Sequence, residues 1–94
     1  MRLTIVPIDN NVGVDGVFHG YLDLSSCGIP ANIHALQWYE TEGEVEFINN
    51  PDRTKPQNEF INTLPEWALS CIAVWEKWLP PAPPPSTSIP TTVI

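Results

Sequence analysis

The first half of the chain alternates apolar and polar residues in short runs separated by turn-forming residues, a pattern typical of antiparallel β-strands. Residues 3–6 have the β-branched, apolar content of a strand. Residues 12–14 and 17–19 flank Asp15-Gly16, a dipeptide that tolerates the positive φ angles of a type I′ turn. The pattern therefore predicts one strand and then a tight hairpin, whose return strand runs toward residues 22–24.

A second hairpin is predicted after a connector at residues 25–32. Residues 33–40 and 44–48 alternate around Thr41-Glu42-Gly43. A two-residue turn at Glu42 and Gly43 would place Trp38 opposite Phe47. The face that packs on the core would then carry four apolar side chains: Leu36, Trp38, Val45 and Phe47. The opposite face would present four more polar side chains to solvent or to a partner: Gln37, Tyr39, Glu44 and Glu46.

The period of the apolar residues changes to that of a helix in the last third of the chain. Residues 49–57 contain two prolines and are predicted to form a surface loop that holds Arg53 and Lys55. Residues 63–66, Thr-Leu-Pro-Glu, match a capping box and predict the start of a helix. Apolar residues then recur at steps of three and four, the stripe of an amphipathic helix that Pro80-Pro81 would end. The stripe comprises Leu64, Trp67, Ala68, Cys71, Ile72, Trp75, Trp78 and Leu79.

These elements predict an α+β fold of two layers, with a four-stranded, mostly antiparallel sheet of two hairpins packed by one C-terminal amphipathic helix. A chain of 94 residues supports a single core, and we assign that domain to residues 1–79. Residues 80–94 hold six of the eleven prolines, mixed with Ser and Thr. This segment is predicted to be an extended polyproline II tail that forms no core and acts as a partner-binding arm.

The charge of the chain narrows the range of partners. Eleven acidic residues against four basic ones give a formal net charge of -7, so the protein repels nucleic-acid phosphates and anionic lipid headgroups. No stretch reaches the roughly 18 apolar residues that a membrane span needs, and no signal-peptide pattern follows the N-terminus. We expect neither nucleic acid nor membrane as a partner, and a location in the cytoplasm.

The residue types that carry chemistry do not form a recognisable site. His19 and His34 would each need a converging nucleophile or carboxylate to act as a general base, and the sequence places none beside them. Cys27 and Cys71 lack zinc-ligand spacing and are expected to be reduced, buried thiols, with a disulfide as the alternative. We therefore predict no enzymatic activity, no catalytic or metal site, and no cofactor.

A run of alternating glutamates is expected to be a solvated acidic edge. On the predicted hairpin the carboxylates would scatter over two faces and a turn, rather than converge on a cation. Charge on an exposed strand also discourages aggregation between sheet edges. The run comprises Glu40, Glu42, Glu44 and Glu46.

Aromatic residues and the tail are the candidate contacts with a partner. Trp67, Trp75 and Trp78 lie near one helix stripe, where a small sheet has little room for three indoles. Either all three belong to the core, or one is exposed as a contact residue beside the tail. Tyr39 is a further candidate. The tail is expected to dock by adding to a sheet edge or by laying prolines in an aromatic groove. Its candidate residues are Pro81, Pro83, Pro84, Pro85, Val93 and Ile94.

Several segments of the chain together form a recognisable set of motifs. The segments are 3–6, 14–17, 22–25, 33–39, 42–47, 58–61 and 64–68, from LTIV near the start to LPEWA at the helix. They are similar to small proteins encoded near the tail-fibre genes of tailed phages, described as tail-fibre assembly chaperones or phage tail proteins. The resemblance covers roughly residues 1–79. Members of that group often continue into an Ala-rich helical region, whereas this chain turns into proline at Pro80.

The resemblance implies a non-enzymatic accessory protein that binds a phage structural protein, in the assembly or attachment of tail fibres, in the host cytoplasm. The alternative is a permanent virion subunit, a tail or capsid decoration protein whose C-terminal arm binds neighbouring subunits, including further copies of itself. A third hypothesis, based on the acidic surface, is a phage inhibitor of a host protein.

Overall fold

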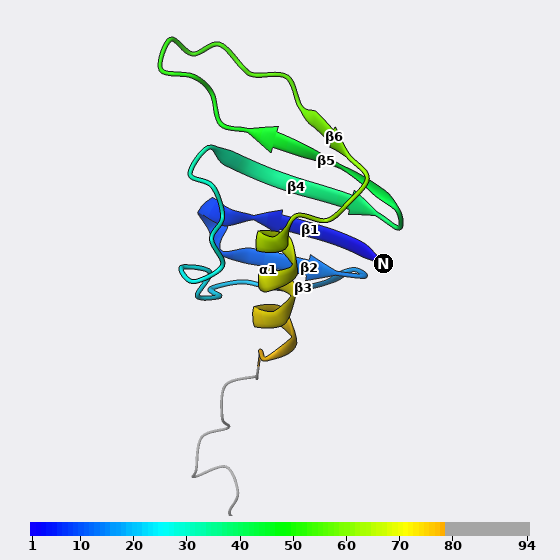
Figure 1. Ribbon diagram of the computed structural model, residues 1–94. Coiled ribbons are helices and arrows are strands. Elements are labelled where there is room, and N and C mark those ends of the chain that lie inside the picture. The colour runs from blue at the N-terminus through cyan, green and yellow to red at the C-terminus, as the bar shows by residue number, and fades with distance from the viewer. Residues whose placement is uncertain (79–94) are drawn as a thin grey trace, which may run out of the picture.

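The computed structural model describes residues 1–78, which form one antiparallel sheet and one α-helix (Figure 1). The sheet has six strands in the order β3-β2-β1-β4-β5-β6. The strands are β1 (Arg2–Val6), β2 (Asn11–Val14), β3 (Val17–His19), β4 (Ile33–Tyr39), β5 (Glu42–Phe47) and β6 (Glu59–Ile61). A short 3-10 helix, η1 (Pro7–Asp9), joins β1 to β2, and α1 (Glu66–Glu76) follows β6. The predicted tail and its six candidate residues lie outside residues 1–78.

The α+β class, the antiparallel sheet and the single C-terminal helix confirm the prediction, but the sheet has six strands rather than four, because all five predicted strand segments join it together with β6. The clearest omission is β6. It is three residues long, too short for an alternating pattern to be visible, and it is held by its pairing with residues 43–45 of β5. The return strand is also shorter than predicted: β3 ends at His19, and Tyr21 then turns the chain with a φ of 58°. Leu22 and Leu24 still enter the core, but from a loop.

The first hairpin is confirmed in detail. Val14 pairs with Val17, and Asp15 and Gly16 have φ values of 50° and 85°, as a type I′ turn requires. The second hairpin turns two residues earlier than predicted, at Glu40 and Thr41, and Trp38 pairs with Gly43 instead of Phe47. The correction moves each partner by four residues. An even slip leaves every side chain on its predicted face, so the predicted core face of this hairpin is correct.

Close packing requires a glycine at position 43. This explains why the turn was predicted in the wrong place, since the glycine there indicates packing rather than a turn. A Cβ built on Gly43 would lie 2.6 Å from the carbonyl oxygen of Gln37 and 2.8 Å from Cε3 of Trp38. The Trp38 indole thus occupies the space beside its cross-strand partner, and its Nε1 donates a 3.1 Å hydrogen bond to the carbonyl oxygen of Glu40. Glu40 itself takes the left-handed conformation of the turn, with a φ of 56°.

We therefore expect Gly43→Ala to lower the free energy of unfolding by about 1–3 kcal/mol, because the new methyl group must displace the indole or the backbone. Gly20→Ala is the matched control, since a Cβ at Gly20 meets nothing within 4 Å. That control should change stability by less than about 0.5 kcal/mol. Urea unfolding followed by tryptophan fluorescence measures both, and equal stability of the two variants would contradict this packing.

The core lies between the sheet and α1 and follows two rows of residues that cross the strands. One row runs through Val12, Ile5, Leu36 and Val45, and the other through Val14, Leu3 and Trp38. A register shift between Ile33 and Ala35 in β4 restores Ile33 to the core face, where it is buried opposite Phe47. Partly buried residues from the strands, the loops and the helix pack around these rows: Ile29, Phe47, Ile61, Leu64, Trp67, Ile72, Val74 and Trp75.

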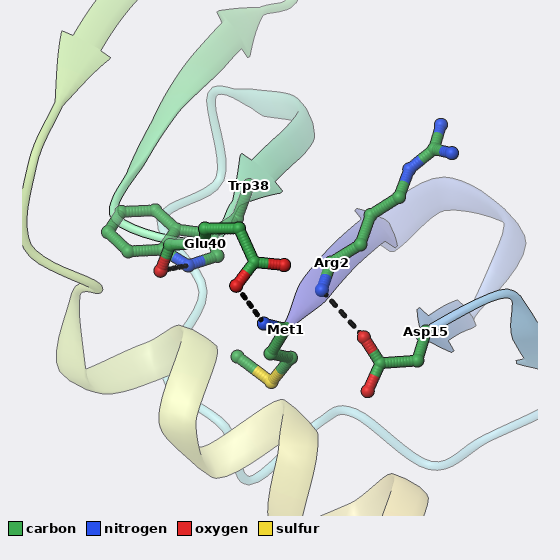
Figure 2. A network of polar contacts seen from close by, with 5 residues as sticks. All are labelled: Met1, Arg2, Asp15, Trp38 and Glu40. Carbon is green, nitrogen blue, oxygen red and sulfur yellow. Dashed lines mark hydrogen bonds and ion pairs between the residues drawn. The ribbon is translucent and has the colours of Figure 1, made fainter.

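Both hairpin turns hold the start of β1 (Figure 2). Asp15 in the first turn accepts a 2.8 Å hydrogen bond on Oδ1 from the backbone N–H of Arg2, and its own N–H donates to the Arg2 carbonyl. Glu40 in the second turn donates its N–H to the carbonyl of Met1, and its carboxylate lies 2.9 Å from the Met1 ammonium. The hydrogen bond that the Met1 ammonium donates to this carboxylate raises the pKa of the amine above its ordinary value.

The helix is shorter than predicted and lacks the predicted capping box. Its N-cap is Pro65, which makes no side-chain hydrogen bond. Thr63 lies two residues before that cap, and its hydroxyl donates to Oδ1 of Asn62 instead. A capping box requires Thr63 to be the N-cap residue itself, so the later start removes it. Ala68 and Cys71 are buried, and most other stripe residues pack against the core, as predicted. The helix ends at Glu76 with Lys77 as C-cap, three residues before the predicted end.

Cys71 on the helix and Cys27 in the loop before β4 are both buried, as predicted, and no disulfide joins them. Burial raises the pKa of the Cys71 thiol from 9.0 to about 12, and a hydrogen bond with Cys27 is the second cause of this shift. The folded state therefore favours the protonated thiol. This contribution to stability is complete below pH 9.0 and is lost as the pH rises toward about 12.

Both thiols should resist iodoacetamide at pH 8 in the folded protein, because both are buried and because Cys71 is also held in its unreactive, protonated form. Both should react quickly in urea. The free energy of unfolding should fall between pH 9.0 and about 12, and Cys71→Ala should reduce that fall. Mass spectrometry of the alkylated protein and urea titrations at several pH values provide the two measurements. Rapid labelling of the folded chain at pH 8 would contradict the buried placement.

Candidate protein-binding face

The helix lies against only one face of the sheet, over β1, β2 and β3 (Figure 1). The residues that alternate with the core rows form the other face, which we call the open face. Its central row crosses all six strands through Phe18, Gly13, Thr4, Gln37, Glu44 and Phe60. A second row joins Arg2, Tyr39 and Glu42. The open face is therefore a continuous surface that carries aromatic, polar and charged side chains.

Three aromatic rings on the open face are largely exposed: Phe18 by 55%, Tyr39 by 51% and Phe60 by 80%. The Phe18 ring covers Gly13, since a Cβ built there would lie 2.3 Å from Cε1 of that ring. Burying an aromatic ring of this size is among the largest sources of binding energy at protein interfaces. Exposure of three rings on one face is the arrangement expected of a contact surface.

Tyr39 and Phe60 line a shallow depression of about 340 Å³ on the open face. The other lining residues are Gln37, Glu42, Gly43 and Glu44. Asn58 donates a 2.9 Å hydrogen bond to Oε1 of Glu44, and Thr4 donates one of the same length to Oε1 of Gln37. The polar groups between the rings are thereby held in place by neighbours on adjacent strands and on the loop before β6.

The glutamates of β5 form a row on the open face, which corrects the prediction that they scatter over two faces. Because the turn lies at Glu40 and Thr41, Glu42 joins the strand and shares a face with Glu44 and Glu46. In the described part of the chain the only ion pair joins Glu40 to the Met1 ammonium. The row thus keeps its negative charge. The nearby cation is Arg2, whose Cζ lies 5.0 Å from the centre of the Tyr39 ring.

The three helix tryptophans are divided between core and surface. Trp67 and Trp75 are partly buried and pack against the core, and Nε1 of Trp75 donates a 2.9 Å hydrogen bond to the carbonyl oxygen of Val17. Trp78 is 38% exposed and stacks flat on His19, with ring centres 3.9 Å apart. One indole is therefore exposed, one of the two predicted alternatives. None of the three lies on the open face, where the fourth candidate, Tyr39, is found.

The titratable residues form no assembled centre in residues 1–78. His19 lies against the Trp75 and Trp78 rings, and His34 is exposed in β4. No three His, Cys, Asp or Glu side chains of this part of the chain gather as metal ligands. The lowered pKa values of Asp23 and Asp52 arise from hydrogen bonds that Ser25 and Thr54 donate within local turns.

Phe18 and Phe60 were missed by sequence reasoning, which considered only the helix tryptophans, Tyr39 and the tail as contacts. The signal for Phe18 was available, because it lies between Val17 and His19 on a predicted strand and must face away from both. Phe60 offered no such signal, because its strand is too short to show a period.

The chain matches no protein-family model, no curated protein and no solved structure. Among residues 1–78, no helix has the length and apolar character needed to cross a membrane.

The two aromatic rings that line the depression should be dispensable for folding. We expect Tyr39→Ser and Phe60→Ser each to change the free energy of unfolding by less than about 0.5 kcal/mol, because the rings are largely in water. Leu36→Ala, at a fully buried position, should cost about 2–5 kcal/mol. Thermal or urea unfolding measures all three, and a large loss for Phe60→Ser would mean that its ring belongs to the core.

Proposed function

We propose that this protein is a non-enzymatic binding protein of a tailed phage, which binds a tail-fibre or tail polypeptide through the open face during fibre assembly or attachment. The single observation that supports a binding role is the set of exposed rings of Phe18, Tyr39 and Phe60 on one uncovered sheet face. A small domain gains stability by burying such rings, so leaving three exposed favours their use in contacts.

The phage assignment is supported by the resemblance of residues 1–79 to small proteins encoded near tail-fibre genes. The alternative within the same class is a permanent virion subunit, whose contacts would include the Pro-rich segment at residues 80–94. The two roles predict different amounts of this protein in the virion. An assembly chaperone leaves its client, whereas a subunit remains in the particle at a fixed ratio.

The test uses the full chain expressed from a phage genome, unchanged and as the double variant Tyr39→Ser/Phe60→Ser. We expect fibre or tail protein to co-purify with the unchanged chain from infected cells, and at least a tenfold smaller amount with the variant, equivalent to about 1.4 kcal/mol of lost binding free energy. Quantitative peptide counts in gradient-purified virions then separate the two roles: absence indicates a chaperone, and a fixed integer ratio indicates a subunit.

A chain that neither enters virions nor retains any phage structural protein would overturn the proposal. Retention that is unchanged in the double variant would remove the open face from it. The surface control is Ile8→Ser, because Ile8 is 80% exposed but lies in η1, outside the rows of the open face.

A further inference from the structure

From the chemistry of the open face we infer its occupant, an inference that rests on the proposed function. We propose that the depression between Tyr39 and Phe60 binds an arginine side chain in a basic segment of the partner polypeptide. The aromatic rings would contact the flat faces of the guanidinium, and the carboxylates of Glu42 and Glu44 would accept its hydrogen bonds. The binding is non-covalent and requires no cofactor.

The residues that line the depression match the needs of a guanidinium group. A guanidinium is planar, stacks on aromatic rings, and presents several N–H donors at its edge. The depression has a ring on each of two strands, Tyr39 in β4 and Phe60 in β6, and the carboxylates of the intervening β5 lie between them. Its volume of about 340 Å³ lies at the lower end of the range of ligand sites, which is enough for one side chain rather than a helix.

The carboxylates have unused capacity for hydrogen bonds. Asn58 occupies Oε1 of Glu44, and within residues 1–78 the second oxygen of that carboxylate accepts no hydrogen bond. Glu44 is only partly exposed, and the carboxylate of Glu42 is exposed beside it. Hydrogen bonds between ionised partners are roughly twice as strong as those between neutral ones, and a carboxylate can bind both edge N–H groups of one arginine.

The protein already shows this mode of contact with its own chain. The Cζ atom of Arg2 lies 5.0 Å from the centre of the Tyr39 ring, and Nη2 donates a 3.3 Å hydrogen bond to the Tyr39 hydroxyl. Arg2 is not among the residues that line the depression. The Tyr39 ring thus accepts a guanidinium on the side of β1, and the depression lies toward β5 and β6.

Charge excludes the other obvious occupants. A second copy of the chain would bring another row of Glu42, Glu44 and Glu46 against the first, and the net charge of -7 adds to that repulsion. An apolar helix would have to bury these carboxylates without a counter-ion, which costs several kcal/mol per charge. A basic segment removes both costs, because its cations pair with the row.

The test uses the full chain and a defined probe, the peptide acetyl-Gly-Arg-Gly-Arg-Gly-amide, with matched peptides that carry lysine or citrulline in place of arginine. Citrulline keeps the shape of arginine and lacks its charge. We expect the arginine peptide to shift the backbone amide signals of β4, β5 and β6 in NMR titrations at low salt. It should bind at least fivefold more tightly than the citrulline peptide, from contacts of about 1 kcal/mol.

The double variant Glu42→Gln/Glu44→Gln should weaken binding of the arginine peptide about tenfold, through the loss of two charged acceptors. The control Asp9→Asn/Glu76→Gln removes the same charge from η1 and α1 and should weaken it less than twofold. Equal affinity for arginine and citrulline, an equal loss in the control, or shifts confined to other strands would each overturn the proposal.

Failure of this inference is distinguishable from failure of the proposed function. If the variant Glu42→Gln/Glu44→Gln still retains fibre protein from infected cells while Tyr39→Ser/Phe60→Ser does not, the binding function stands. The partner segment is then apolar rather than basic. If the arginine peptide binds at the depression but no phage structural protein is retained, the site stands and the phage function fails.

Discussion

The pairing of β1 with two neighbours is the interaction on which the rest of the structure depends. β1 forms antiparallel ladders with β2 on one side and β4 on the other, so it joins the two hairpins into one sheet. Its residues Leu3 and Ile5 are wholly buried, and each belongs to one of the two core rows. The turns of both hairpins bind the backbone at Met1 and Arg2, which fixes the register of this central strand. Without β1 the sheet would divide into the ribbon β3-β2 and the unit β4-β5-β6, and a two-stranded ribbon is only marginally stable alone.

Two glycines reveal how the sheet packs aromatic rings on both faces. Gly13 lies opposite Phe18, and Gly43 lies opposite Trp38. In each pair the ring occupies the space that a Cβ of the glycine would need. An aromatic residue that covers a cross-strand glycine shields backbone that would otherwise be exposed to water. The Trp38 pair faces the core and the Phe18 pair faces the open side, so the same device serves stability in one hairpin and a contact surface in the other.

The class of fold and the core face were predictable because they depend on periods of two and about four along the sequence. The register of the second hairpin was not, because Gly43 looks the same in a sequence whether it forms a turn or lies under an indole. The helix stripe was predictable, whereas its N-terminus was not, because a sequence match to a capping box at Thr63 does not establish which residue caps the helix, and the N-cap is Pro65. The candidate site was only partly predictable for a related reason. Tyr39 was identified from the sequence, but Phe60 lies near it only because Phe60 pairs with Glu44 at the edge of the sheet.

The glutamates of β5 lie on the face of the sheet that the helix leaves uncovered. Both edge strands, β3 and β6, have three residues, and a Trp75 hydrogen bond occupies the carbonyl of Val17 on β3. Short or covered edges resist pairing with another chain, whereas the open face exposes the aromatic rings of Phe18, Tyr39 and Phe60. Such a face on a neutral protein would also bind copies of itself. The glutamates of β5 oppose that association through repulsion and leave the aromatic rings accessible to a cationic partner. In the proposed mode of binding, one row of carboxylates therefore both opposes self-association and selects partners by the sign of their charge before the rings make contact.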